Sequence, residues 1–220
     1  MNCCSHGQGI ATTFDRKNAE RELEQYRRKG PDPVTRRLLA EVAAAGGGAD
    51  SVLDIGSGVG IVAFELLMAG ASRATLVEAS AASLAAAVEE ANRRGLAQRI
   101  TPCEGDVVDL AAGLPAADVV TLNRVICCYP DMRRLVQSSA NLARRHYAAV
   151  YPRESWWVKL VFAAENVVRR LQGNTFRTFV HPEREIEGGL WSAGLRPRAR
   201  FRGTIWVTAV FERQEFGEVG

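Results

Sequence analysis

The nine residues VLDIGSGVG, at positions 52–60, decide how this chain folds. Their first half is a short apolar run that predicts a buried strand over 51–55. The apolar-rich residues 60–69 predict a helix that ends at Gly70. Glycines let the backbone approach a ligand closely, and the first N–H groups of a helix are free to donate hydrogen bonds to it. The stretch therefore predicts a loop that binds a nucleotide, and the alternative is a tight turn with no ligand.

Two details of this loop distinguish between ligands. The dinucleotide fingerprint G-x-G-x-x-G/A requires a small residue where this chain has Ile61, and the third glycine comes one residue early, at Gly60. The negative charge of Asp54, just before the glycines, opposes a pyrophosphate. A ligand with a cationic amino group and no phosphate suits that carboxylate better, and the methionine part of S-adenosylmethionine meets this requirement. The loop thus favours S-adenosylmethionine over a nicotinamide dinucleotide.

Polar side chains also follow the next predicted strands. Glu78 ends the second strand, where a carboxylate can accept hydrogen bonds from both ribose hydroxyls. Asp106 follows the third strand and can accept from an adenine amino group, although Glu104 and Asp109 are close in sequence. Asn123 ends the fourth strand and is expected to face the reacting end of the cofactor. Open α/β sheets bind ligands at the carboxyl ends of their strands, so these residues belong to one expected site.

Predicted strands and helices alternate along the chain. Strands are expected at 51–55, 74–77, 99–103, 118–122 and 146–151, and helices at 15–29, 35–45, 60–69, 81–94, 131–144, 156–171 and 182–193. This alternation implies a parallel sheet with helices on both faces. Residues 197–202 and 204–213, separated by Gly203, predict an antiparallel hairpin. We expect an α/β fold with a doubly wound, mostly parallel sheet, a C-terminal antiparallel hairpin and N-terminal helices.

With these motifs, residues 35–213 resemble the class I S-adenosylmethionine-dependent methyltransferases. The resemblance implies a Rossmann-like sheet of seven strands, the last one antiparallel, with S-adenosylmethionine as the cofactor. It also implies that the methionine part is held by the glycine loop, the ribose by the end of the second strand, and the adenine by the segment after the third. The residues concerned are Asp54, Gly56, Ser57, Gly58 and Gly60, then Glu78 and Ala79, then Asp106 and Val107.

A narrower resemblance concerns two stretches that are expected to border the substrate. The stretches NRVICCYPD, at 123–131, and FVHP, at 179–182, are similar in layout to magnesium-protoporphyrin O-methyltransferases. A porphyrin carboxylate is therefore one candidate acceptor. Related small-molecule methyltransferases of unassigned substrate could share this layout equally well, so the acceptor stays open.

Methyl transfer is an in-line displacement that needs a general base only when the nucleophile must lose a proton. His181 is the best candidate for a base or substrate-orienting group, and a structural hydrogen bond is the alternative role. Tyr129 is expected to line the pocket or to pack beneath the next helix. Arg124 and Arg153 are candidates for neutralising an anionic substrate, and Trp156 for contacting it.

Two helices have unusual apolar patterns. The helix at 15–29 has a thin apolar stripe, so we expect residues 1–34 to form an N-terminal segment with a weakly docked lid helix over the cofactor, and residues 35–220 to form the methyltransferase domain. The helix at 156–171 has apolar residues on more than one face. This pattern predicts that one side is buried and that another contacts a second element or an apolar substrate.

The amino-acid composition limits the kinds of binding partner that we expect. The net charge is +3, and no block of like charges indicates a nucleic-acid tail. The five cysteines do not resemble a disulfide framework, and Cys3, Cys4 and His6 lack the spacing of a metal site. We expect no metal, no nucleic-acid partner, no membrane span and no signal peptide, and hence a cytoplasmic enzyme with a small-molecule substrate.

Two other functions remain as alternatives. One is a non-catalytic relative that keeps the fold and binds a partner. The other is a nicotinamide-dependent oxidoreductase, which Asp54, Ile61 and the terminal hairpin disfavour. The sequence does not specify the oligomeric state.

Overall fold

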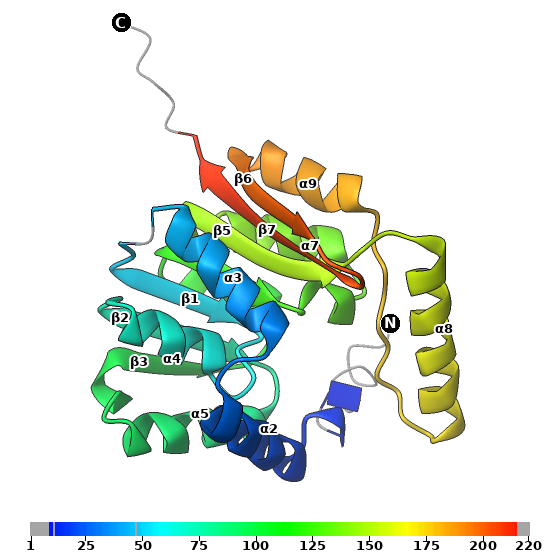
Figure 1. Ribbon diagram of the computed structural model, residues 1–220, viewed down its shortest axis with the longest axis horizontal. Coiled ribbons are helices and arrows are strands. Elements are labelled where there is room, and N and C mark those ends of the chain that lie inside the picture. Colours follow the sequence, from blue (N-terminus) through cyan, green and yellow to red (C-terminus); the bar gives the residue numbers. More distant parts are fainter. Residues whose placement is uncertain (1–8, 11, 47, 215–220) are drawn as a thin grey trace, which may run out of the picture.

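Seven strands form the centre of the molecule in the order β3-β2-β1-β4-β5-β7-β6 (Figure 1). The computed structural model describes residues 9–10, 12–46 and 48–214. The first five strands run parallel, and β7 pairs antiparallel with both β5 and β6. The strands are β1 (Ser51–Ile55), β2 (Arg73–Glu78), β3 (Ile100–Glu104), β4 (Ala117–Asn123), β5 (Ala143–Pro152), β6 (Leu195–Arg202) and β7 (Trp206–Arg213). The predicted fold class is confirmed.

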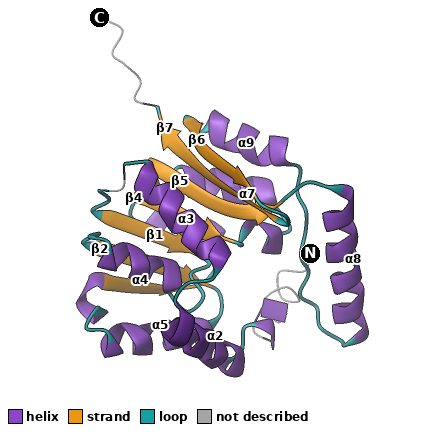
Figure 2. Ribbon diagram, viewed as in Figure 1, coloured by secondary structure: helices purple, strands orange, loops and turns teal. Residues whose placement is uncertain are grey.

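Helices cover both faces of this sheet (Figure 2). On one face, α2 (Arg16–Lys29), α3 (Pro33–Ala44), α4 (Ile61–Met68) and α5 (Ala81–Arg93) share one apolar core. On the other, α6 (Val107–Leu110), α7 (Met132–Ala140) and α9 (Glu183–Ser192) share a second. A further helix, α8 (Trp156–Leu171), packs on neither core and lies at the periphery. Short 3₁₀ turns occur at Ala97–Arg99, Ala111–Gly113 and Ile126–Cys128.

The direction of the strand order reverses at β1. The chain proceeds from β1 to β2 and β3 on one side, then crosses to β4 on the other. Asp54 of β1 pairs with Thr121 of β4 at this reversal. Loops leave the carboxyl ends of β1 and β4 in opposite directions, which opens a crevice in sheets of this kind. The topology therefore places the glycine loop beside this crevice, where sheets of this kind bind ligands.

The sequence predicted most ends of helices and strands well, because these ends depend on residues close together in the chain. Ser80 caps α5 by accepting a hydrogen bond from the Ser83 N–H, as predicted. The predicted helix 131–144 is too long: α7 ends at Ala140, and β5 begins at Ala143. Ala143 pairs with Ala117 of β4, so a ladder with a distant strand overrides the local helical pattern. The last strand begins at Trp206 rather than at residue 204.

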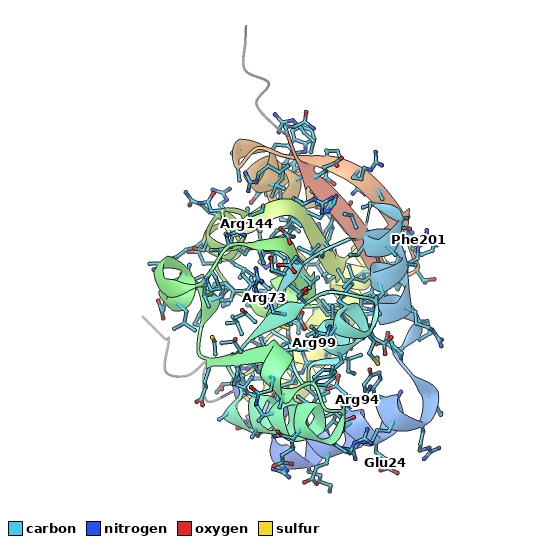
Figure 3. All side chains as sticks on the ribbon, turned by 90° about the vertical axis from the view of Figure 1, so that its left-hand side faces the viewer. Glu24, Arg73, Arg94, Arg99, Arg144 and Phe201 are labelled. Carbon is cyan, nitrogen blue, oxygen red and sulfur yellow. The ribbon has the colours of Figure 1, made fainter. Side chains whose placement is uncertain are left out.

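The N-terminal helix α2 is held by more than its thin apolar stripe. Leu23 and Tyr26 are buried, and the Tyr26 hydroxyl donates to Glu65 Oε1 at 2.7 Å. The guanidinium of Arg94, labelled in Figure 3, lies 4.5 Å from the centre of the Tyr26 ring. Arg27 also pairs with the buried Glu90 at 2.6 Å. These contacts dock α2 against the rest of the fold, and the proposed boundary between residues 34 and 35 falls inside α3.

Candidate active site

A cavity of about 600 Å³ lies where the glycine loop meets the carboxyl ends of the strands, a size typical of small-molecule sites. Its floor comes from the ends of β1, β2 and β4. Its other walls come from the segment before α2, from α8 and from the turn between β6 and β7. The predicted site residues that line it are Asp54, Gly56, Ser57, Gly58, Glu78, Ala79, Asp106, Val107, Asn123, Arg124 and Tyr129.

The three loop glycines all have left-handed backbones, with φ of 61° at Gly56, 54° at Gly58 and 84° at Gly60. They differ in what surrounds them. A Cβ on Gly56 would lie 2.5 Å from Val125 Cγ2, and one on Gly60 would lie 2.8 Å from Phe64 Cζ. At Gly58 a Cβ would meet nothing within 4 Å. Gly56 and Gly60 are therefore required by packing as well, whereas Gly58 leaves open space through which a ligand can approach the backbone.

Asp54 is the most deeply buried acid that lines the cavity, with 1% of its surface exposed. Its Oδ1 accepts a hydrogen bond from the Thr121 hydroxyl at 2.6 Å. Its Oδ2 is buried and has no hydrogen-bond partner among the described residues. Burial raises the pKa of Asp54 to about 7, although the Thr121 hydroxyl and the Ala63 backbone N–H oppose this shift. A buried carboxylate with one unused oxygen is suited to a cationic donor that enters the cavity.

Glu78 ties the glycine loop to the end of β2. Its Oε2 accepts from the Gly58 N–H at 2.8 Å, and its Oε1 accepts from the Ser80 N–H at 2.7 Å. Burial raises its pKa, and these hydrogen bonds oppose the shift. Because each carboxylate oxygen can accept a second hydrogen bond, Glu78 retains capacity for ligand hydroxyls.

Asp106 and Tyr129 form a hydrogen-bonded pair on the cavity wall. Asp106 caps α6 by accepting from the Val108 N–H, and its Oδ2 accepts from the Tyr129 hydroxyl at 2.8 Å. Burial, reinforced by this hydrogen bond, raises the pKa of Tyr129 well above its usual value. The tyrosine therefore stays protonated near neutral pH, and its proton points at Asp106.

Asn123 and Arg124 connect the end of β4 to the start of α3. Arg124 has a φ of 64°, and its guanidinium donates to Asp32 Oδ2 at 2.9 Å. Asn123 Nδ2 donates to the Thr35 hydroxyl at 2.9 Å, while its Oδ1 is buried without a partner among the described residues. Arg124 therefore lines the cavity but is already paired with an acid, which opposes the predicted role in binding an anion.

Four predicted residues do not line the cavity: Gly60, Arg153, Trp156 and His181. Gly60 is the N-cap of α4, at the end of the loop. Trp156, at the start of α8, is 78% exposed. His181 Nε2 lies 3.0 Å from the Tyr129 carbonyl oxygen, and burial lowers the histidine pKa. His181 therefore has a hydrogen bond to the Tyr129 backbone and does not line the cavity.

Sequence reasoning missed one cation on the cavity wall. Arg169 of α8 lines the cavity, donating to the Thr178 hydroxyl at 3.0 Å and to Glu165 Oε2 at 3.2 Å. The i, i+4 spacing of Glu165 and Arg169, on the side of α8 away from Trp156, is a signal that could have indicated it. The lid segment also contributes Phe14 and Glu22 to the wall.

The described residues form no metal centre. Within them, no three His, Cys, Asp or Glu side chains are placed to hold a metal ion. The predicted absence of a site at Cys3, Cys4 and His6 concerns residues outside that part of the chain. None of the described helices combines the length and apolar character needed to cross a membrane.

Comparisons with known proteins agree with this geometry. Residues 52–146 match a family model described as a methyltransferase domain. No curated protein matches the chain. Among solved structures, magnesium protoporphyrin IX methyltransferase from Synechocystis PCC 6803 with bound SAH is 18% identical, with a TM-score of 0.73, covering 95% of this chain and 100% of that chain.

Other similar structures have a range of described substrates. An O-methyltransferase family protein from Burkholderia thailandensis is 19% identical, with a TM-score of 0.66 over 93% of this chain and 64% of that chain. A putative RNA methyltransferase from Pyrococcus horikoshii is 16% identical, with a TM-score of 0.60 over 85% and 87%. Likeness at this level of identity concerns the fold. Residues 52–146 therefore resemble a methyltransferase domain, and the chain has the Rossmann-like fold of S-adenosylmethionine-dependent methyltransferases.

Proposed function

We propose that this protein is an S-adenosylmethionine-dependent methyltransferase that methylates an O, N or C atom of a small molecule by in-line displacement. The observation that carries the proposal is the buried Asp54 Oδ2, which lacks a partner among the described residues. It belongs to a carboxyl group that lines a cavity beside an open glycine backbone. The amino group of S-adenosylmethionine supplies the missing cationic donor, whereas a pyrophosphate would meet a like charge.

The residues present fit the whole cofactor. Asp54 and the loop backbone at Gly58 would hold its methionine part, and Glu78 would accept from its ribose hydroxyls. Asp106 and Val107 would border its adenine. The bound cofactor supplies a methyl group already activated by a sulfonium. The protein's contribution is then to align the acceptor with that methyl group and to keep water out.

The cavity walls favour an acceptor that needs no strong base. The Tyr129 hydroxyl donates a hydrogen bond to Asp106, and the His181 ring is hydrogen-bonded to a backbone carbonyl. Tyr129 is protonated, and His181 does not line the cavity, so neither side chain is placed there as a base. The acceptor side is bordered by apolar side chains such as Phe162, Ile205 and Trp206. An apolar molecule with an ionised carboxylate satisfies both conditions, so porphyrin carboxylates are the first acceptors to test.

The same observations also bear on the alternative functions. Asp54 disfavours a nicotinamide dinucleotide, and an intact cofactor loop disfavours a protein that only binds a partner. The net charge of +3 is small for a nucleic-acid enzyme. Cytoplasmic localisation and the absence of nucleic-acid and metal partners are part of this proposal.

Calorimetric titration with S-adenosylmethionine and S-adenosylhomocysteine is the direct test, with NADH as the control. We expect micromolar affinity for both sulfur ligands and no heat of binding with NADH. If folded protein binds neither sulfur ligand, the proposed function is wrong. If it binds both but methylates no acceptor in a broad screen, the non-catalytic alternative is favoured.

We predict that His181 acts as a positioning residue. In His181→Ala, the Tyr129 carbonyl, just after the turn at Ile126–Cys128, loses its hydrogen bond to the His181 ring, so Tyr129 is less well placed. Turnover should fall roughly tenfold with an accepted substrate, while cofactor affinity stays within about threefold. His181→Gln, which retains a donor, should recover part of the loss. A pH profile that changes shape in His181→Gln would contradict this role and indicate proton transfer by the histidine.

A further inference from the structure

The helix α8 has an apolar face that no described residue covers. This outer face consists of Trp156, Leu160, Ala163, Ala164, Val167 and Leu171. At 3.6 residues per turn these positions fall within an arc of about 100°, the width of a stripe that normally faces a core. Yet Trp156 is 78% exposed, Leu160 62%, Val167 57% and Leu171 83%. An exposed apolar stripe of this kind is typical of a protein interface.

The opposite side of α8 is already in use. Val158 and Phe162 are buried in a small apolar cluster with Cys127, and Glu165 and Arg169 line the cavity. Figures 1 and 2 show α8 at the edge of the molecule, away from the sheet. Its inner side thus closes the cavity, and its outer face points away from the fold. Because the apolar cluster beneath α8 is small, contacts on its outer face would help to hold α8 in place as a wall of the cavity.

The order of large and small side chains along the outer face is the same in both directions. Large residues, Trp156 and Leu171, stand at its two ends, and Leu160 and Val167 lie about one turn inside them. The two small residues, Ala163 and Ala164, stand at its centre. An antiparallel copy therefore places large side chains opposite large ones and alanines opposite alanines. Small residues at the crossing point let two helices approach closely, and a two-fold axis requires this kind of self-complementary pattern.

The size of the face also suits a dimer. At these exposed fractions the outer face presents on the order of 600 Å² of apolar surface. Monomers rarely expose an apolar patch above roughly 300–600 Å², and stable interfaces bury about 800 Å² per partner. Val168, which is 52% exposed, borders the face and extends it toward that size.

Charge is consistent with the antiparallel direction. Glu154, just before α8, forms an ion pair with Lys159 at 2.9 Å, and Arg170 lies in the last turn. Antiparallel pairing brings Arg170 of one copy to the end where Glu154 of the other copy lies. It also opposes the two helix dipoles, whereas a parallel pair aligns them.

We infer that the outer face of α8 binds the same face of a second copy, in an antiparallel two-fold dimer. Each copy then holds the other's α8 against the cavity it closes. The inference rests on the pattern and exposure of α8 and is independent of the proposed methyl transfer.

Analytical ultracentrifugation at micromolar concentration tests the dimer directly. The wild type should sediment at twice the 24.0 kDa mass of one chain. Leu160→Lys and Val167→Glu should each weaken the dimer by at least about 100-fold, because each buries two unpaired charges. The matched control is Met68→Lys on α4, where the methionine is 54% exposed; it should remain dimeric. Circular dichroism should show the same helix content in all variants.

Mixing the two charged variants tests the direction of pairing. In the antiparallel register, Leu160 lies opposite Val167 of the partner, so Leu160→Lys and Val167→Glu should form a heterodimer within about tenfold of wild-type affinity. In a parallel pair these positions do not meet, and mixing would restore nothing. A monomeric wild type overturns the inference, including one that instead sediments with phosphatidylcholine and phosphatidylglycerol vesicles. A dimer that Leu160→Lys leaves intact also overturns it.

Discussion

Asp54→Asn is expected to lower S-adenosylmethionine affinity by at least about 100-fold and, at the same time, to stabilise the protein without ligand. The carboxylate is buried and its Oδ2 has no partner among the described residues, so the Thr121 hydroxyl and the Ala63 N–H compensate its charge only in part and a bound cation completes the compensation. Asparagine has nearly the same shape, carries no charge and can still accept from Thr121. The substitution therefore removes the attraction for the ligand together with the cost of a buried charge.

The pH dependence of this effect follows from the raised pKa. Burial moves the pKa of Asp54 from 3.8 to about 7, so the folded state binds this proton more tightly than the unfolded state does. The resulting stability is present below the unfolded pKa and is lost as pH rises through about 7. Near pH 8, Asp54→Asn should therefore melt roughly 5 °C above the wild type, and near pH 5 the difference should shrink.

Calorimetry and thermal melts from pH 5 to pH 8 measure both effects. Wild-type affinity for S-adenosylmethionine should rise over this range as Asp54 ionises, and the affinity of Asp54→Asn should not. Asp50→Asn is the matched control, because Asp50 precedes β1 at the opposite end of the strand and its side chain is 55% exposed. If Asp54→Asn binds the cofactor as tightly as the control, Asp54 does not hold it.

Glu78→Ala should also lower cofactor affinity at least about 100-fold, but with the opposite effect on stability. Both carboxylate oxygens accept backbone hydrogen bonds, from Gly58 and from Ser80. Alanine leaves these two N–H groups unpaired, at a cost of roughly 1–3 kcal/mol each. The melting temperature of the ligand-free protein should fall by about 5–10 °C.

Glu78→Gln separates the two contributions of this side chain. Glutamine keeps one acceptor oxygen, so stability should fall by about half as much as in Glu78→Ala, while ribose binding remains weak. Thermal melts and titration with S-adenosylhomocysteine provide both measurements. Unchanged affinity in Glu78→Ala would contradict the assignment of Glu78 to the ribose, whatever the melting temperature.

The sequence by itself determined the features that depend on residues close together in the chain. The apolar run ending in VLDIGSGVG specified β1, the glycine loop and the start of α4, because strand burial, left-handed glycines and helix initiation are local properties. The alternation of elements then specified a doubly wound sheet, and carboxylates at strand ends predicted Asp54 and Glu78 on the cavity wall.

Only the tertiary structure decided which charged side chains are available to a ligand. Arg124 is engaged by Asp32, which lies 92 residues away in the chain, and His181 is engaged by Tyr129, which lies 52 residues away. Arg169 reaches the cavity because α8 turns that side inward and leaves Trp156 outside. A long polar side chain takes whichever partner the fold brings near it, and local sequence patterns carry no record of that partner.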